Sequence, residues 1–237
     1  AARLREALDR ADVIVTMSEA VKRGLLSRHG IEAHRVAVVP PGRPGFGGPG
    51  AGPPGGVSGD GRYVLAVGTI EPRKNYPALV AAWAAVRSRH PDVILRIVGR
   101  PDRGRPAVED AVRRHRLDGA VLLMGEVEDA ALPRLYREAA AVVVPSLDEG
   151  FGFAALEGMA CGRPVVVSDR GSLPEVVGGA GLVAAPEAEP LAGAMIRVLE
   201  DSALAARLGA AGAARAAEFT WERAAAQIVA AYARALA

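Results

Sequence analysis

The chain has 237 residues, of which 50% are hydrophobic, 24% charged and 4% aromatic, and its formal net charge is +2. This composition excludes a disordered chain, and a single cysteine, Cys161, excludes an internal disulfide and a cysteine-based zinc cluster. The small net charge and the few aromatic side chains give no basis for a nucleic-acid partner. No apolar run in the sequence, the segment 139–144 included, is long enough to span a bilayer.

The first part of the chain predicts a small unit of two helices and two short apolar strands. These helices are expected at 2–10 and 18–28, and the strands at 13–15 and 36–39. Ser18 is a favourable N-cap, because its hydroxyl accepts from the free N–H groups of the first helical turn. The chain begins at Ala1 without an initiator methionine, and we expect it to be a fragment of a longer protein.

Residues 42–61 have a different composition, because ten of these twenty positions are glycine. Such a stretch buries little apolar area and is typical of a flexible linker. No Gly-Lys-Ser/Thr sequence ends it, so it is not a phosphate-binding loop. We place a domain boundary here.

From residue 62 onward, strand-length apolar runs alternate with helical stretches. The predicted strands are 63–67, 93–98, 120–124, 141–144, 164–167 and 181–184. The predicted helices are 76–89, 105–116, 128–139, 152–161, 173–177, 187–200, 202–217 and 221–236. Continuous Val, Ile and Leu runs indicate strands buried on both faces, and the alternation indicates right-handed crossovers. The sequence therefore predicts an α/β fold with a doubly wound parallel sheet.

In an open parallel sheet, ligands bind beyond the carboxyl ends of the strands, so the turns that follow the strands are the candidate sites. The first candidate turn, 67–75, has Gly68 at the strand end and the pair Arg73 and Lys74 before the next helix. Gly68 allows a ligand to approach the backbone, while the guanidinium and ammonium groups are suited to phosphate. The alternative is a solvated basic turn.

The second candidate turn contains Glu149, a Gly-x-Gly sequence at Gly150 and Gly152, and Glu157 eight residues after the first acid. A helix that begins near Gly152 would present free amides to an anion such as phosphate. Side chains on a helix tilt toward its N-terminus, so Glu157 is expected to reach the same opening. Two carboxylates suit hydroxyl donors, such as ribose diols and sugars. The alternative is an acid that complements the helix dipole and a second acid with structural partners only.

A third turn, 124–128, contains Val127. It is a candidate for binding the edge of a nucleotide base through main-chain groups, and the alternative is an ordinary turn.

Several motifs of other enzyme classes are absent from the sequence. The strand 63–67 is not followed by Gly-x-Gly-x-x-Gly, which leaves nicotinamide binding unsupported, and the Gly-x-Ser-x-Gly motif of hydrolases is absent. The four histidines show no metal-ligand spacing, and Cys161 is expected to be a small buried residue.

These motifs resemble the retaining nucleotide-sugar glycosyltransferases of family 4, which have the GT-B fold. Glu149 and Glu157 match the Glu-x7-Glu motif of that family, in the context Glu-Gly-Phe-Gly and Leu-Glu-Gly-Met-Ala-Cys-Gly-Arg-Pro-Val-Val. Gly-Thr-Ile-Glu-Pro-Arg-Lys-Asn is typical of a mannosyltransferase-like subset, and 171–176 and 219–221 also fit. The resemblance covers roughly 62–217, the donor-binding half.

The resemblance implies a role for each motif residue. Lys74 and Arg73 would hold the donor diphosphate together with the amides of Gly152 and Phe153. Glu157 would accept hydrogen bonds from the ribose hydroxyls. Glu149 would contact the transferred sugar and stabilise charge at its anomeric carbon. The implied catalytic residues are Glu149, Lys74 and Arg73. The implied donor-binding residues are Gly68, Thr69, Val127, Gly150, Phe151, Gly152, Phe153 and Glu157. Thr69 stands where many members carry arginine, and Arg73 would compensate.

The resemblance also implies a domain organisation. Residues 1–41 would be the end of an N-terminal acceptor domain and its hinge, 42–61 a linker, 62–218 a Rossmann-like donor domain, and 219–237 a helix that crosses back onto the acceptor domain. That last helix carries an apolar stripe, part of which would be exposed without its partner domain: Trp221, Ile228, Tyr232 and Leu236.

The expected function is therefore transfer of a hexose, with a mannose-like sugar on a GDP or UDP carrier favoured, to an acceptor hydroxyl. The acceptor, a glycan, lipid or small molecule, would bind the missing N-terminal domain, so the isolated chain is expected to be inactive. The resemblance implies no metal and no cofactor, and a cytoplasmic location, either free or peripheral at the inner membrane face. The alternatives are a non-catalytic nucleotide-binding module of the same fold and, less favoured, a sugar-nucleotide epimerase.

Overall fold

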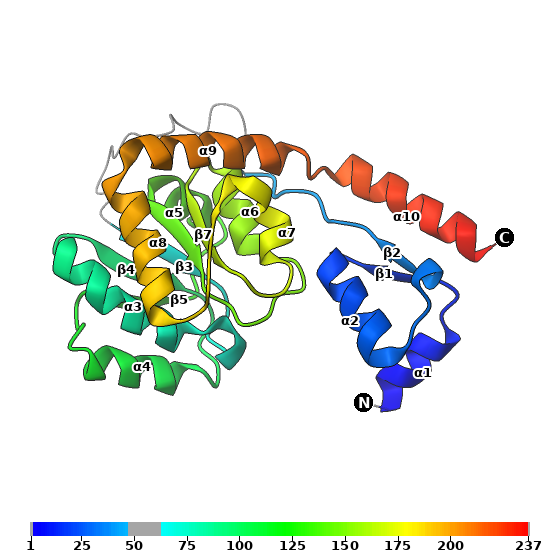
Figure 1. Ribbon diagram of the computed structural model, residues 1–237, viewed down its shortest axis with the longest axis horizontal. Helices are drawn as coiled ribbons and strands as arrows, with labels where there is room; N and C mark the ends of the chain where they lie inside the picture. The colour runs from blue at the N-terminus through cyan, green and yellow to red at the C-terminus, as the bar shows by residue number, and fades with distance from the viewer. Residues whose placement is uncertain (1, 47–62, 237) are drawn as a thin grey trace.

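A computed structural model describes residues 2–46 and 63–236 (Figure 1). Its centre is a six-stranded, all-parallel sheet with the strand order β5-β4-β3-β6-β7-β8. The strands are β3 (Tyr63–Val67), β4 (Ile94–Val98), β5 (Val121–Gly125), β6 (Ala141–Val144), β7 (Val165–Ser168) and β8 (Leu182–Ala184). The predicted fold class, an α/β doubly wound parallel sheet, is confirmed.

Helices cover both faces of this sheet (Figure 1). They are α3 (Tyr76–Arg89), α4 (Arg105–Arg114), α5 (Leu132–Glu138), α6 (Phe153–Ala160), α7 (Leu173–Val177), α8 (Ala188–Glu200), α9 (Ser202–Ala217) and α10 (Trp221–Ala235). Side chains of a strand alternate between faces. Val64 therefore packs in a core with α3, α4 and α8, while its neighbour Leu65 packs in a second core with α5, α6 and α7. Every residue of β6 and β7 is buried, as the apolar runs predict.

The strand order reverses between β3 and β6. From β3 the chain proceeds outward through β4 and β5, and it then returns to β6, beside β3, before it proceeds through β7 and β8. Such a switch point leaves a crevice at the carboxyl ends of its two central strands, which is where doubly wound folds bind ligands. The two principal candidate turns follow these two strands.

Among the predicted helices that are shorter than expected, two have a clear local reason. The helix expected at 128–139 begins at Leu132, because Pro133 occupies its first turn, where a missing N–H costs nothing and where a preceding helical turn would clash. The helix expected at 105–116 ends at Arg114, and Arg116 adopts a left-handed conformation with φ 54°. Three short 3-10 helices were not predicted: Ala33–Arg35, Pro72–Lys74 and Gly178–Ala180.

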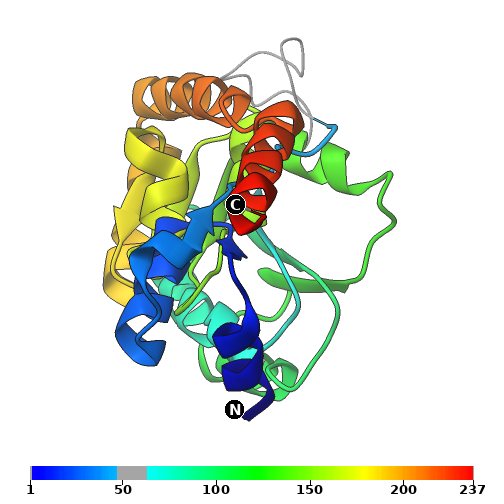
Figure 2. The same cartoon turned by 90° about the vertical axis from the view of Figure 1, so that its right-hand side faces the viewer.

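The N-terminal residues form a separate small unit beside the main sheet. It consists of α1 (Ala2–Arg10), α2 (Glu19–His29) and the parallel pair β1 (Ile14–Thr16) and β2 (Val36–Val38). Ser18 caps α2 as predicted, with its hydroxyl accepting from Val21 N–H at 3.2 Å. Helix α10 extends from the main body toward this unit, and its end lies over the two strands (Figure 2). Arg234 near that end donates to the carbonyl of His34.

The outward face of α10 is open to solvent. Trp221 and Tyr232 of the predicted stripe are 59% and 65% exposed. The connection to the main sheet passes the start of α10 and reaches α5, because Arg43 N–H donates to the Phe219 carbonyl at 2.8 Å and Phe46 stacks on Tyr136. Most of the predicted linker, 47–61, lies outside the described residues.

Candidate functional site

The turn after β3 brings a basic pair, Arg73 and Lys74, to the switch point. Gly68 has φ 147°, and a Cβ there would lie 3.0 Å from Lys74 Cε, so glycine allows the lysine to lie across the end of the strand. Asn75 then ties this turn to the other half of the sheet, because its amide donates to the carbonyls of Pro145 at 3.1 Å and Pro186 at 2.8 Å. The position of the basic pair is thus set by both halves.

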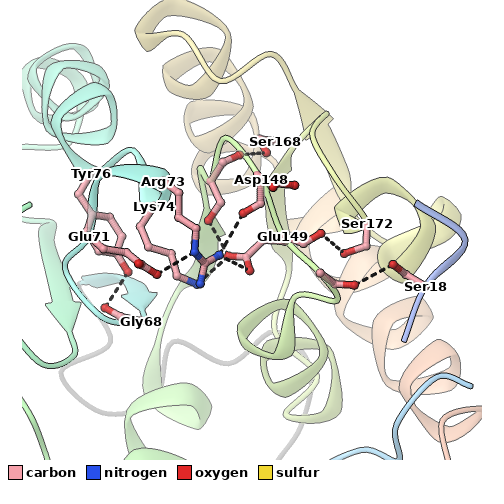
Figure 3. A network of polar contacts seen from close by, with 12 residues as sticks. Ser18, Gly68, Glu71, Arg73, Lys74, Tyr76, Asp148, Glu149, Ser168 and Ser172 are labelled. Atoms are coloured by element: carbon pink, nitrogen blue, oxygen red, sulfur yellow. Dashed lines mark hydrogen bonds and ion pairs between the residues drawn. The ribbon is translucent and has the colours of Figure 1, made fainter. Parts of the chain in front are cut away.

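The basic pair closes on Glu149, which follows β6 (Figure 3). Lys74 Nζ lies 2.6 Å from Glu149 Oε1, and Arg73 Nη1 lies 2.9 Å from Glu149 Oε2. Arg73 also pairs with Glu71 at 2.8 Å and donates to the Asp148 carbonyl at 3.0 Å. Each oxygen of the Glu149 carboxylate therefore faces a cation.

The protonation of Glu149 follows from these contacts. Its side chain is buried, and burial alone would raise its pKa. The charge of Lys74, together with hydrogen bonds from Lys74, from Ser146 at 2.8 Å and from Arg73, outweighs burial and lowers the pKa of Glu149 below its ordinary value. Glu149 is thus an ionised carboxylate at neutral pH.

The backbone around Glu149 is fixed by the turn that follows β7. Ser172 donates to the Glu149 carbonyl through its N–H at 3.1 Å and its hydroxyl at 2.9 Å. Gly171 has φ 58°, and a Cβ there would lie 2.6 Å from both the amide nitrogen and the carbonyl oxygen of Glu149. Only glycine permits this close approach.

The turn after β6 leads into α6, whose N-terminus faces the same opening. Gly152, with φ 99°, is the N-cap, and α6 begins at Phe153, so the amides of the first turn have no carbonyl partners within the helix. Phe153 is 45% exposed, whereas Phe151 is buried against it and against Phe219.

Glu157 reaches back from the second turn of α6 to this opening. Its Oε2 accepts from the Tyr136 hydroxyl at 2.5 Å. Burial raises the pKa of Glu157 above its ordinary value, and the hydrogen bond from Tyr136 and the charge of Lys74 only partly offset that effect. The two carboxylates therefore border the same opening with opposite pKa shifts.

These elements line a cavity of about 460 Å³ that is open to solvent. Nine of the predicted residues line it: Gly68, Arg73, Lys74, Glu149, Gly150, Phe151, Gly152, Phe153 and Glu157. Thr69 and Val127 do not line it, since Val127 packs at the edge of the second core. Residues that line it without having been predicted are Met17, Val67, Leu132 and Ala154. Met17 belongs to the N-terminal unit, and nothing in its local sequence indicates this position.

The N-terminal unit contacts the turn directly. The Ser18 hydroxyl donates to the Gly150 carbonyl at 2.7 Å (Figure 3). The carboxylate of Glu175 accepts from the amides of Glu19 at 2.9 Å and Ala20 at 3.2 Å, and so caps the N-terminus of α2 from the main body. A second cavity, of about 530 Å³, lies between α2 and the 147–149 turn, and Glu149 lines it too.

The strand order and the position of the cavity define a doubly wound α/β protein with its site at the switch point. The family model described as Glycosyl transferases group 1 matches residues 61–201, and the chain belongs to this family.

Curated relatives agree with this assignment. The chain is 39% identical over 175 residues to the O-antigen chain mannosyltransferase B of Escherichia coli, a match that covers 72% of this chain and 45% of the relative. It is 36% identical over 244 residues to a D-inositol 3-phosphate glycosyltransferase of Acidothermus cellulolyticus, a match that covers 96% of this chain and 54% of the relative. The chain thus spans about half the length of these relatives.

Solved structures show the same architecture. Sucrose-phosphate synthase from Thermosynechococcus elongatus superposes with a TM-score of 0.81 at 30% identity, over 97% of this chain and 60% of that one. HepE of Anabaena, solved with UDP and glucose, superposes with a TM-score of 0.83 at 23% identity, over 97% of this chain and 66% of HepE. The fold is that of the C-terminal half of a GT-B protein, as predicted. In the described part of the chain, no helix is both long enough and apolar enough to cross a membrane.

Proposed function

We propose that this chain is the nucleotide-sugar-binding half of a retaining, family 4 glycosyltransferase. The observation that carries the proposal is the Glu149 carboxylate, which is held between Lys74 and Arg73 at the switch point and faces the N-terminus of α6 across one cavity. Fixed cations and helix amides suit a diphosphate, and carboxylates suit sugar hydroxyls.

The proposed reaction exchanges one bond at the anomeric carbon of the donor sugar. The bond to the diphosphate oxygen breaks, a bond to the acceptor oxygen forms, and the proton of the acceptor hydroxyl passes to the leaving diphosphate. Lys74, Arg73 and the amides of Gly152 and Phe153 meet the negative charge that develops on the leaving diphosphate, so these residues, in place of a metal ion, supply the electrostatic stabilisation. Glu149 faces the positive charge that develops at the sugar.

The donor is proposed to be a hexose nucleotide with a mannose-like sugar. The names of several relatives support mannose, among them the mannosyltransferase of Escherichia coli and the phosphatidyl-myo-inositol mannosyltransferase of Mycolicibacterium smegmatis. HepE, of similar fold, was solved with UDP, which supports a nucleoside diphosphate at this edge of the sheet.

The acceptor, a glycan, lipid or small molecule, is proposed to bind an N-terminal domain of which residues 1–41 are the end. The matches cover only 45% and 54% of two relatives, and Glu149 lines both the cavity beside α2 and the proposed donor cavity. We therefore expect no sugar transfer by the 237-residue chain alone. The intact protein is proposed to act in the cytoplasm, either free or peripheral to the inner membrane face.

Calorimetric titration of the chain with UDP, GDP, ADP and their hexose derivatives tests the proposal. One nucleotide should bind selectively, and Lys74→Ala should weaken it about 10- to 100-fold, the range for a charge-assisted hydrogen bond. Lys22→Ala is the matched control, since the only other lysine donates to the Val36 carbonyl in the N-terminal unit. If no nucleotide binds, or if both variants behave alike, the proposed donor site is wrong.

A further inference from the structure

The hydroxyl group of Tyr136 has no role in the proposed reaction, yet it is aimed at the site. Tyr136 lies on α5, is 0% exposed, and donates to Glu157 Oε2 at 2.5 Å. A buried tyrosine hydroxyl requires a partner, but a backbone carbonyl would serve equally well. Tyr63 in the same core illustrates this, because its hydroxyl donates to the Leu135 carbonyl at 2.7 Å.

The ring of Tyr136 is held firmly in position. It packs in the second core between the sheet and α6, and Phe46 stacks on it with ring centroids 6.0 Å apart and an angle of 25° between planes. The phenol oxygen lies on the long axis of the ring, so its position is fixed by the packed ring and does not change when the ring rotates about that axis. Tyr136 therefore fixes the position of the atom to which it donates.

Glu157 receives a directional restraint at one oxygen only. Within 2–46 and 63–236, the bond from Tyr136 is the sole hydrogen bond recorded for its side chain, and it engages Oε2. The carboxylate is half-buried and lines the cavity. A carboxylate accepts several hydrogen bonds, so Oε1 keeps its full capacity toward a ligand in the cavity.

We infer that Tyr136 is a positioning residue, which locks the Glu157 carboxylate through Oε2 so that Oε1 accepts from a ribose hydroxyl of the bound nucleotide. This inference rests on the proposed function, in which Glu157 contacts the ribose. A freely rotating glutamate would lose conformational entropy on binding, and the restraint removes that cost in advance.

The charges around Glu157 are consistent with this role. The ionisable groups that act on it are Tyr136 on α5 and Lys74 beyond β3, and the charge of Glu157 in turn raises the pKa of Cys161 at the end of α6. Burial raises the pKa of Glu157, whereas the Tyr136 hydrogen bond opposes that rise and favours the ionised acceptor.

The test compares a ribonucleotide with its deoxy forms. The tightest binder among UDP, GDP and ADP is titrated into the 237-residue chain beside its 2′-deoxy and 3′-deoxy analogues. The wild type should prefer the ribonucleotide over at least one analogue by about tenfold, as one hydrogen bond to a charged group predicts. Glu157→Gln should reduce that preference to about twofold, because a neutral amide is a weaker acceptor.

Tyr136→Phe should reduce the same preference to about threefold while it retains the ring and its packing. Tyr63→Phe, which also removes one buried hydroxyl, should leave the preference at the wild-type value. Because the preference is a ratio of two affinities, a partly unfolded sample lowers both and leaves the ratio unchanged. A structural role alone would therefore not alter it.

The outcomes separate the two proposals. If wild type and Glu157→Gln behave as expected and Tyr136→Phe keeps the full preference, the positioning role is overturned while the proposed function stands. If the wild type binds no nucleotide, or binds the ribonucleotide and both deoxy forms equally, the proposed contact of Glu157 with ribose is wrong, and the positioning role falls with it.

Discussion

The two sides of the cavity hold their carboxylates in opposite ways. On the β6 side, Glu149 is paired with two cations, and its pKa is lowered. On the α6 side, eight residues later, Glu157 is paired with a neutral phenol, and its pKa is raised. Two acids of one motif thus differ in charge environment because one meets the turn after β3 and the other meets α5. The difference suits electrostatic work at Glu149 and hydrogen-bond recognition at Glu157.

The largest expected effect separates catalysis from binding at Glu149. In the intact enzyme, Glu149→Gln should slow sugar transfer by about 10³-fold, the scale of losing one electrostatic group at a reacting centre. In the 237-residue chain, the same substitution should tighten nucleoside diphosphate binding by about fivefold, because Lys74 and Arg73 lose the carboxylate that competes with phosphate. Single-turnover kinetics and calorimetry measure the two effects.

Asp148→Asn is the control, since this exposed neighbour contributes its carbonyl, and not its side chain, to Arg73. Unchanged transfer in Glu149→Gln would remove Glu149 from the reaction. Weaker nucleotide binding in Glu149→Gln would show that its ion pairs position the basic pair and do not compete with the ligand.

The contrast between the carboxylates also predicts opposite effects on stability. The lowered pKa of Glu149 means that its stabilisation is present above its ordinary value of 4.5 and is lost as the pH falls through the folded-state pKa. The raised pKa of Glu157 means that its ionised form destabilises the fold, and this penalty disappears as the pH falls through its folded-state pKa. Their variants should therefore differ most at neutral pH.

At pH 7, Glu149→Gln should lower the free energy of unfolding by about 2 kcal/mol, because it leaves cations without their buried partner. Glu157→Gln should raise it by about 1 kcal/mol or less, because a neutral amide replaces a half-buried charge. Urea unfolding between pH 3.5 and 7 measures both, and the difference between the variants should shrink toward the acid end. Shifts of the same sign at pH 7 would contradict the comparison.

The sequence was sufficient for the sheet but not for this contrast. Apolar runs such as 141–144 indicate buried strands directly, and the alternation with helices indicates parallel strands, whose carboxyl ends carry Gly68 and Glu149 at one edge. The strand order, which makes β3 and β6 neighbours, was not predicted. The direct ion pair of Lys74 with Glu149 was not predicted, because it depends on how two turns 75 residues apart meet. Tyr136 was missed for a similar reason, since its partner depends on the rotation of α5 against α6. Pro133 is a signal that was present, and it marks where α5 begins.

The smallest expected loss of stability concerns Ser146, which donates to Glu149 Oε1 at 2.8 Å beside Lys74. Ser146→Ala should lower the free energy of unfolding by about 1.5 kcal/mol at pH 7, as the loss of a buried hydrogen bond to a charged group predicts. In the Glu149→Gln background, the same substitution should cost about half as much, because a neutral amide accepts more weakly. The double-mutant cycle therefore yields the coupling between hydroxyl and charge. Additive costs would show that Ser146 stabilises the turn independently of the charge on Glu149, and the low pKa of that carboxylate would then have to come from the two cations alone.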